Sequence, residues 1–77
     1  MNLKKLKQAF IILKSQKLIK YYEIEINNKE NKIDKIYKTF FIAYNNKSYF
    51  INFPYIRNMD KSITDIKELI YNNYLKN

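Results

Sequence analysis

The sequence predicts an α+β fold in which two helices cover one face of a three-stranded antiparallel meander. Near both ends of the 77-residue chain, apolar residues recur every three or four positions, which is the period of a helix. Between these segments they recur every second position, which is the period of a half-buried strand. The predicted order is therefore α-β-β-β-α, and residues 1–77 are predicted to form a single domain.

The first helix is predicted at residues 2–16. Its apolar residues follow one another at spacings of three, four and three, which places them on one face: Leu3, Leu6, Phe10 and Leu13. Lys17 would fall on that face, so the helix is expected to end near Gln16. The run Ala9–Leu13 is too short for a signal peptide or a membrane span, so we expect a soluble, cytoplasmic protein, in a bacterial host if a phage encodes it.

Three strands are predicted, at residues 19–27, 35–44 and 47–54. Because the chain has no glycine, Asn45 and Asn46 are the residues best able to form the tight turn between the second and third strands. A two-residue turn would pair Tyr44 with Lys47, and this register fixes which side chains share a face.

In this register one face of the sheet is apolar and is expected to pack under the helices. It is made up of Tyr22, Ile24, Ile26, Ile36, Phe40, Ile42, Tyr44, Tyr49, Ile51, Phe53 and Tyr55. Lys38 is the one misfit on this face and is expected at the end of the sheet.

The opposite face is aromatic, polar and slightly acidic, and neither helix is available to cover it. It collects Tyr21, Glu23, Glu25, Tyr37, Thr39, Phe41, Ala43, Ser48, Phe50 and Asn52. Phe41 is expected directly opposite Phe50. Either these aromatic pairs only stabilise the sheet, or the patch is a protein interface. The candidate interface residues are Tyr21, Tyr37, Phe41 and Phe50. Stacking of nucleobases is a third hypothesis, which the two glutamates disfavour because they repel phosphate.

The second helix is predicted at residues 62–76. Ser62 followed by Asp65 three residues later is typical of a helix N-terminus. Its apolar face holds Ile63, Ile66, Ile70 and Tyr74.

Double-stranded-RNA-binding domains and several small phage inhibitors share the predicted element order. The RNA-binding version would need clustered lysines at the start of its last helix. Here Lys61 and Lys67 stand among acidic residues. Element order by itself implies no function.

The net charge of +8 comes from fourteen lysines and one arginine against seven acidic residues. The first twenty residues hold six lysines and no acidic residue. A basic surface is predicted from Lys4, Lys7, Lys14, Lys17 and Lys20. Arg57 is a separate candidate for bidentate recognition of carboxylate or phosphate.

Codon bias is an alternative explanation for the lysines. Ile, Lys, Asn, Tyr and Phe, which A/T-only codons encode, make up 51 of the 77 residues. An AT-rich gene would supply lysine with or without a polyanionic partner.

The composition disfavours enzyme chemistry. Without cysteine and histidine there is no Ser-His or Cys-His pair and no thiolate or imidazole metal site. Without glycine there is no phosphate-cradling loop. Glu23 and Glu25 are interpreted as solvated strand residues. No catalytic, metal-binding or cofactor-binding residue is predicted, and no cofactor.

The leading hypothesis is a small non-enzymatic binding protein that acts through protein contacts, by self-association as a homodimer or by docking an acidic or nucleoprotein target. Its concrete form is a phage or mobile-element inhibitor of a host nucleic-acid machine, such as a defence or transcription complex. The alternatives are direct, sequence-independent nucleic-acid binding through the basic N-terminal helix, and a role as a ribonucleoprotein subunit. Membrane binding is not expected, because the apolar side of that helix is needed to cover the sheet.

Overall fold

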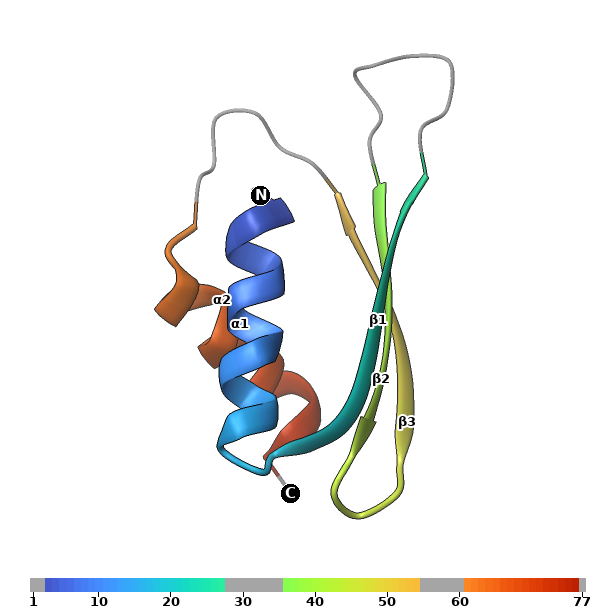
Figure 1. Ribbon diagram of the computed structural model, residues 1–77, viewed down its shortest axis with the longest axis vertical. Helices are drawn as coiled ribbons and strands as arrows, with labels where there is room; N and C mark the ends of the chain where they lie inside the picture. The colour runs from blue at the N-terminus through green and yellow to red at the C-terminus, as the bar shows by residue number, and fades with distance from the viewer. Residues whose placement is uncertain (1–2, 28–35, 55–60, 77) are drawn as a thin grey trace.

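The fold class is confirmed by the structure, a computed structural model that describes residues 3–27, 36–54 and 61–76. The elements in chain order are α1 (Leu3–Ser15), β1 (Ile19–Asn27), β2 (Ile36–Ala43), β3 (Ser48–Pro54), α2 (Ile63–Ile70) and the π-helical turn η1 (Tyr71–Leu75). The strands form one antiparallel sheet in the order β1-β2-β3. Both α1 and the C-terminal helix pack on the same side of this sheet (Figure 1), so neither of them covers its other side.

The chain leaves α1 through a left-handed residue. The N–H of Leu18 donates to the carbonyl of Leu13 at 3.0 Å, and the N–H of Lys17 donates to that of Lys14, also at 3.0 Å. Lys17 has a φ of 60°, a conformation that glycine usually supplies at the end of a helix. This turn ends the helix near the position expected from the sequence and directs the chain into β1.

The hairpin between β2 and β3 has a three-residue connection, so the predicted two-residue turn is wrong. The N–H of Ala43 donates to the carbonyl of Lys47, and the N–H of Asn46 donates to the carbonyl of Ala43, both at 2.9 Å. Asn46 carries the positive φ, 70°, and the side chain of Asn45 accepts from the N–H of Lys47 at 3.1 Å. This is a type I turn closed by a left-handed residue, a common three-residue hairpin loop.

The extra loop residue shifts the register of β2 and β3 by one residue. As a result, β2 presents the opposite face to the helices from the one that was predicted. Phe41 lies opposite Tyr49, and Phe40 lies opposite Phe50. The helix-facing side of β2 therefore consists of Tyr37, Thr39, Phe41 and Ala43, all of which are buried. Phe40, Ile42 and Lys38, which the two-residue turn placed in the core, lie on the other side. The predicted core residue Tyr44 is in the turn and is exposed.

The faces of β1 and β3 agree with the sequence-based assignment. Tyr49, Ile51 and Phe53 point toward the helices and are half-buried or buried, and Tyr22 and Ile24 pack against the core from β1. Ile26, at the far end of β1, stays exposed. Tyr55 lies outside the described residues.

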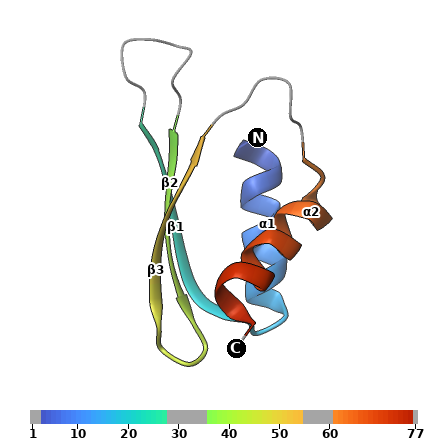
Figure 2. The same ribbon diagram turned by 180° about the vertical axis from the view of Figure 1, so that it is seen from behind.

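Phe41 joins both helices to the sheet. Its ring centroid lies 5.6 Å from that of Phe10 in α1 and 6.0 Å from that of Tyr74 in η1. Phe10 also stacks on Tyr22 at 5.5 Å, so α1 covers the β1 side of the sheet. Tyr74 contacts Tyr49 at 5.4 Å, so the C-terminal helix covers the β3 side, as Figure 2 shows from behind.

The C-terminal helix begins where the sequence indicates but does not stay α-helical. The hydroxyl oxygen of Ser62 accepts from the N–H of Asp65 at 3.1 Å, which caps α2. After Ile70 the helix widens into η1, whose last backbone bond joins the N–H of Lys76 to the carbonyl of Tyr71 at 2.7 Å. The wider turn belongs to the segment that brings Tyr74 over the sheet.

Candidate binding surfaces

Nine side chains form a three-by-three grid on the side of the sheet that the helices do not cover. Each row takes one residue from each strand, and the rows are Tyr21–Ile42–Ser48, Glu23–Phe40–Phe50 and Glu25–Lys38–Asn52. We call this grid the open face. Its middle is apolar, while its carboxylates stand on the β1 side.

An aromatic row crosses the open face. The ring centroids of Phe40 and Phe50 are 4.7 Å apart, and those of Phe40 and Tyr21 are 6.3 Å apart. Phe50 exposes 83% of its surface and Tyr21 exposes 43%, whereas Phe40 is half-buried between them. An apolar ring as exposed as Phe50 has little to stabilise it within the chain, since a cross-strand aromatic pair contributes only about 0.2–1 kcal/mol.

The open face carries two carboxylates and one ammonium group. Glu25 stands opposite Lys38, which offsets its charge, while Glu23 accepts a hydrogen bond from the hydroxyl of Tyr21. That hydrogen bond, with smaller contributions from desolvation and from the negative charge of Glu23, raises the pKa of Tyr21 above its ordinary value. The ring of Tyr21 meets that of Phe40 edge-on.

The structure places two of the four predicted interface residues on the open face and removes the other two. Tyr21 and Phe50 are there. Tyr37 and Phe41 are not, because the three-residue turn rotates them into the core, where they expose 5% and 0% of their surfaces. Phe40 and Ile42 take their places. Lys38 was the residue in the sequence that indicated this register, because shifting the pairing of β2 and β3 by one residue moves its side chain out of the core.

A second surface runs along α1. Lys4, Lys7, Ile11 and Lys14 are spaced by three, four and three residues, so they share one stripe of the helix, and all four are exposed. We call these four residues the basic stripe. α1 and the open face lie on opposite sides of the sheet (Figure 1), so the two surfaces do not merge.

The other predicted basic residues are not part of this stripe. Lys17 is exposed at the turn after α1. Lys20 is held at the hairpin, where its ammonium donates to Oδ1 of Asn46 at 2.6 Å and lies 5.7 Å from the ring centroid of Tyr44. Arg57 lies outside the described residues.

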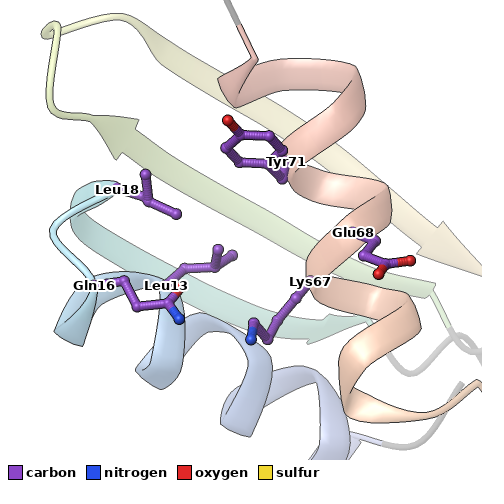
Figure 3. A pocket seen from close by; sticks show the side chains of 6 residues that line it. All are labelled: Leu13, Gln16, Leu18, Lys67, Glu68 and Tyr71. Carbon is purple, nitrogen blue, oxygen red and sulfur yellow. The ribbon is translucent and has the colours of Figure 1, made fainter.

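A shallow apolar cavity of about 240 Å³ lies between the end of α1 and the C-terminal helix. Leu13, Leu18 and Tyr71 provide its apolar lining, and Gln16, Lys67 and Glu68 complete it, with Lys67 reaching from α2 toward α1 (Figure 3). This cavity could not be predicted from the sequence, because it depends on how the two helices are placed.

The described residues include no cluster of three or more His, Cys, Asp or Glu side chains that could hold a metal ion. In the same ranges, no helix has the length and apolar character needed to cross a membrane.

Comparison with known proteins gives no relative. The sequence matches no protein-family model, and the searches of curated proteins and of solved structures found no match either.

Proposed function

We propose that this protein is a non-enzymatic binding protein that docks a partner protein on the open face of its sheet. The observation that carries the proposal is the exposure of Phe50, a large apolar ring in β3 that packs tilted against Phe40 and is left uncovered by either helix. Exposed apolar patches of this kind mark contact sites, and aromatic residues dominate the energetics of protein interfaces.

The chemistry of the open face indicates which partner fits. Its apolar middle would accept aliphatic or aromatic side chains, and Glu23 and Glu25 would pair with lysine or arginine beside them. The remaining charge of the chain is strongly positive. A partner that belongs to a nucleoprotein complex satisfies both features, because its protein meets the open face and its phosphates attract the lysines.

The concrete form of this proposal is an inhibitor or adaptor of a nucleic-acid-handling complex, encoded by a phage or mobile element. The support is the small size of the chain, its AT-rich composition and the presence of an apolar and a basic surface on opposite sides of one sheet. Such an arrangement suits a protein that attaches to a protein on one side and a polyanion on the other.

The test is affinity capture from lysate of the native host, with and without nuclease, using wild type, Phe50→Glu and the control Ile11→Glu. Ile11 is also an exposed apolar residue, but it lies on α1. We expect a defined protein partner that survives nuclease, is kept by Ile11→Glu and is lost with Phe50→Glu while circular dichroism shows an intact fold. A partner that both variants retain would exclude the open face as the docking surface.

Direct nucleic-acid binding is the second candidate function, and one specific observation favours it. Lys4, Lys7 and Lys14 lie exposed on a single stripe of α1 that is about 15 Å long, from the 1.5 Å rise per helical residue. Such a row can follow a phosphate backbone without reading its sequence. If capture vanishes with nuclease and survives Phe50→Glu, this function replaces the first.

A further inference from the structure

No strand in residues 3–27, 36–54 and 61–76 pairs with the outer edge of β3, and the hydrogen bonds of the hairpin show which of its backbone groups face outward. Ala43 and Lys47 form a hydrogen-bonded pair, so hydrogen-bonded pairs recur at every second residue along the hairpin. Tyr49, Ile51 and Phe53 therefore point their backbone groups toward β2. The carbonyl of Ile51 agrees with this, since it also accepts from the hydroxyl of Thr39 in β2 at 2.9 Å.

It follows that Ser48, Phe50 and Asn52 direct their N–H and C=O groups away from the sheet. β3 is the last strand in the sheet order, and no other strand among the described residues pairs with it. These three residues, at every second position of β3, each present an N–H donor and a C=O acceptor in the plane of the sheet. Another strand can pair with such a row of donors and acceptors.

The two edges of the sheet differ in how they are protected. β1 carries Lys20, Glu23 and Glu25, and its register with β2 is irregular between Ile19 and Tyr21. Charges and irregularities of this kind discourage edge-to-edge pairing. β3 contains no charged residue from Ser48 to Pro54. The β3 edge is therefore the one open to pairing.

We propose that β3 pairs antiparallel with β3 of a second copy of this chain, around a two-fold axis at Phe50, to form a continuous six-stranded sheet. This register places Phe50 of one copy opposite Phe50 of the other and Ser48 opposite Asn52, so all three outward-facing residues are used. Moving the axis to Ile51 would instead pair Ser48 with Pro54, which has no N–H to donate. The inference goes beyond the proposed function, because it concerns the strand edge and identifies the occupant as a second copy.

Charge and area both favour this arrangement. Each copy carries +8, so two copies repel each other least where they meet through an uncharged strand. Pairing would also make the aromatic row continuous, from Tyr21, Phe40 and Phe50 of one copy into the same three residues of the other. The open face of one copy covers only about 300 Å², from the spacing and rise of its strands, whereas a specific interface takes about 800 Å² per partner. The six-stranded sheet would double the area available to a docking protein.

Amide hydrogen exchange by NMR, combined with sedimentation velocity over a wide range of protein concentration, tests the dimer. In the dimer the amides of Phe50 and Asn52 become protected as concentration rises, while Ile51 is protected throughout by β2. High salt strengthens the dimer, because it screens the repulsion between two basic chains. A protein that stays monomeric at all concentrations, with the Phe50 amide exchanging freely, would overturn the proposal.

Three variants at Asn52 test the outer edge of β3. Asn52→Pro removes an outward N–H without touching the β2 ladder, while the matched Asn52→Ala keeps it. We expect Asn52→Pro to weaken the dimer at least about tenfold, since the symmetry removes two hydrogen bonds at once, and Asn52→Ala to change it little. Asn52→Lys, which places a charge on the strand without altering the backbone, is expected to weaken the dimer as well.

A dimer that survives Asn52→Pro and is lost with Phe40→Glu would mean that copies stack face to face, and it would refute edge pairing. Failure of the proposed function gives a different result, because the partner would then be captured equally by wild type and Phe50→Glu whatever the oligomeric state.

Discussion

The rings of Phe40 and Phe50 lie side by side across β2 and β3, 4.7 Å apart between their centroids, on the side of the sheet that faces away from both helices. The neighbouring residue Phe41 points the other way and exposes none of its surface. Two adjacent phenylalanines in one strand therefore have opposite environments, and only the register of the hairpin decides which of them is in the core.

This register gives the first prediction, a large difference in stability between Phe41→Ala and Phe50→Ala. Phe41→Ala leaves a cavity between Phe10, Tyr49 and Tyr74 and is expected to lower the free energy of unfolding by about 3–5 kcal/mol. Phe50→Ala removes an exposed ring and is expected to cost less than about 1 kcal/mol. Urea unfolding followed by circular dichroism measures both. Equal losses would mean that the two-residue turn is correct after all.

The elements of the fold could be predicted from the sequence, because each depends on local pattern. The spacing of Leu6, Phe10 and Leu13 predicts α1, and Ser62 marks the start of α2, whose cap the structure contains. The alternation in β1 and β3 likewise predicts which of their side chains face the helices.

The face of β2 could not be predicted, because both of its faces are apolar. Tyr37 and Phe41 on one side and Phe40 and Ile42 on the other suit a core equally well by hydrophobicity. The choice depends on one residue of turn length, and Asn46 can hold a positive φ in a two-residue or a three-residue loop. Lys38 was the only side chain that distinguished the two registers. The choice of register also decides which residues of β2 lie on the open face.

The second prediction concerns Lys17, the left-handed residue that ends α1 in a chain without glycine. Lys17→Gly should raise the free energy of unfolding by about 0.5–1 kcal/mol, because glycine takes a φ of 60° without the steric cost that a side chain brings. The matched control is Lys14→Gly, which removes the same charge from within the helix and should cost up to about 1 kcal/mol. Thermal unfolding distinguishes these opposite signs, and a loss for both variants would contradict the role of Lys17.

The third prediction addresses the basic stripe through the salt dependence of binding to duplex DNA. In a plot of the logarithm of the binding constant against the logarithm of the salt concentration, each phosphate contact adds about −0.9 to the slope. Changing Lys4, Lys7 and Lys14 to Gln should therefore make the slope less steep by about 2–3. The control changes three lysines outside α1 to Gln, namely Lys38, Lys47 and Lys76, for the same loss of charge. If both triple variants reduce the slope equally, the attraction is a property of the net charge and not of the stripe.

The fourth prediction follows from the hydrogen bond between the hydroxyl of Tyr21 and the carboxylate of Glu23. This bond is the main cause of the raised pKa of Tyr21, so Glu23→Gln should lower that pKa toward its ordinary value. Titration of the Tyr21 ring carbons by NMR measures the change. An unaltered titration in Glu23→Gln would show that the carboxylate does not hold the hydroxyl in solution.

The same hydrogen bond has a consequence for stability at alkaline pH. A group whose pKa is higher in the folded than in the unfolded state stabilises the fold fully below its unfolded pKa, which for tyrosine is about 10, and this stabilisation is lost as pH rises through the folded pKa. Above that pH, ionised Tyr21 and Glu23 repel each other. Any stability advantage of wild type over Glu23→Gln should therefore shrink as pH rises past about 10, as measured by urea midpoints, because the variant has no carboxylate at this position to repel the phenolate. An advantage that stays constant across this range would mean that the contact with Glu23 does not depend on the Tyr21 proton.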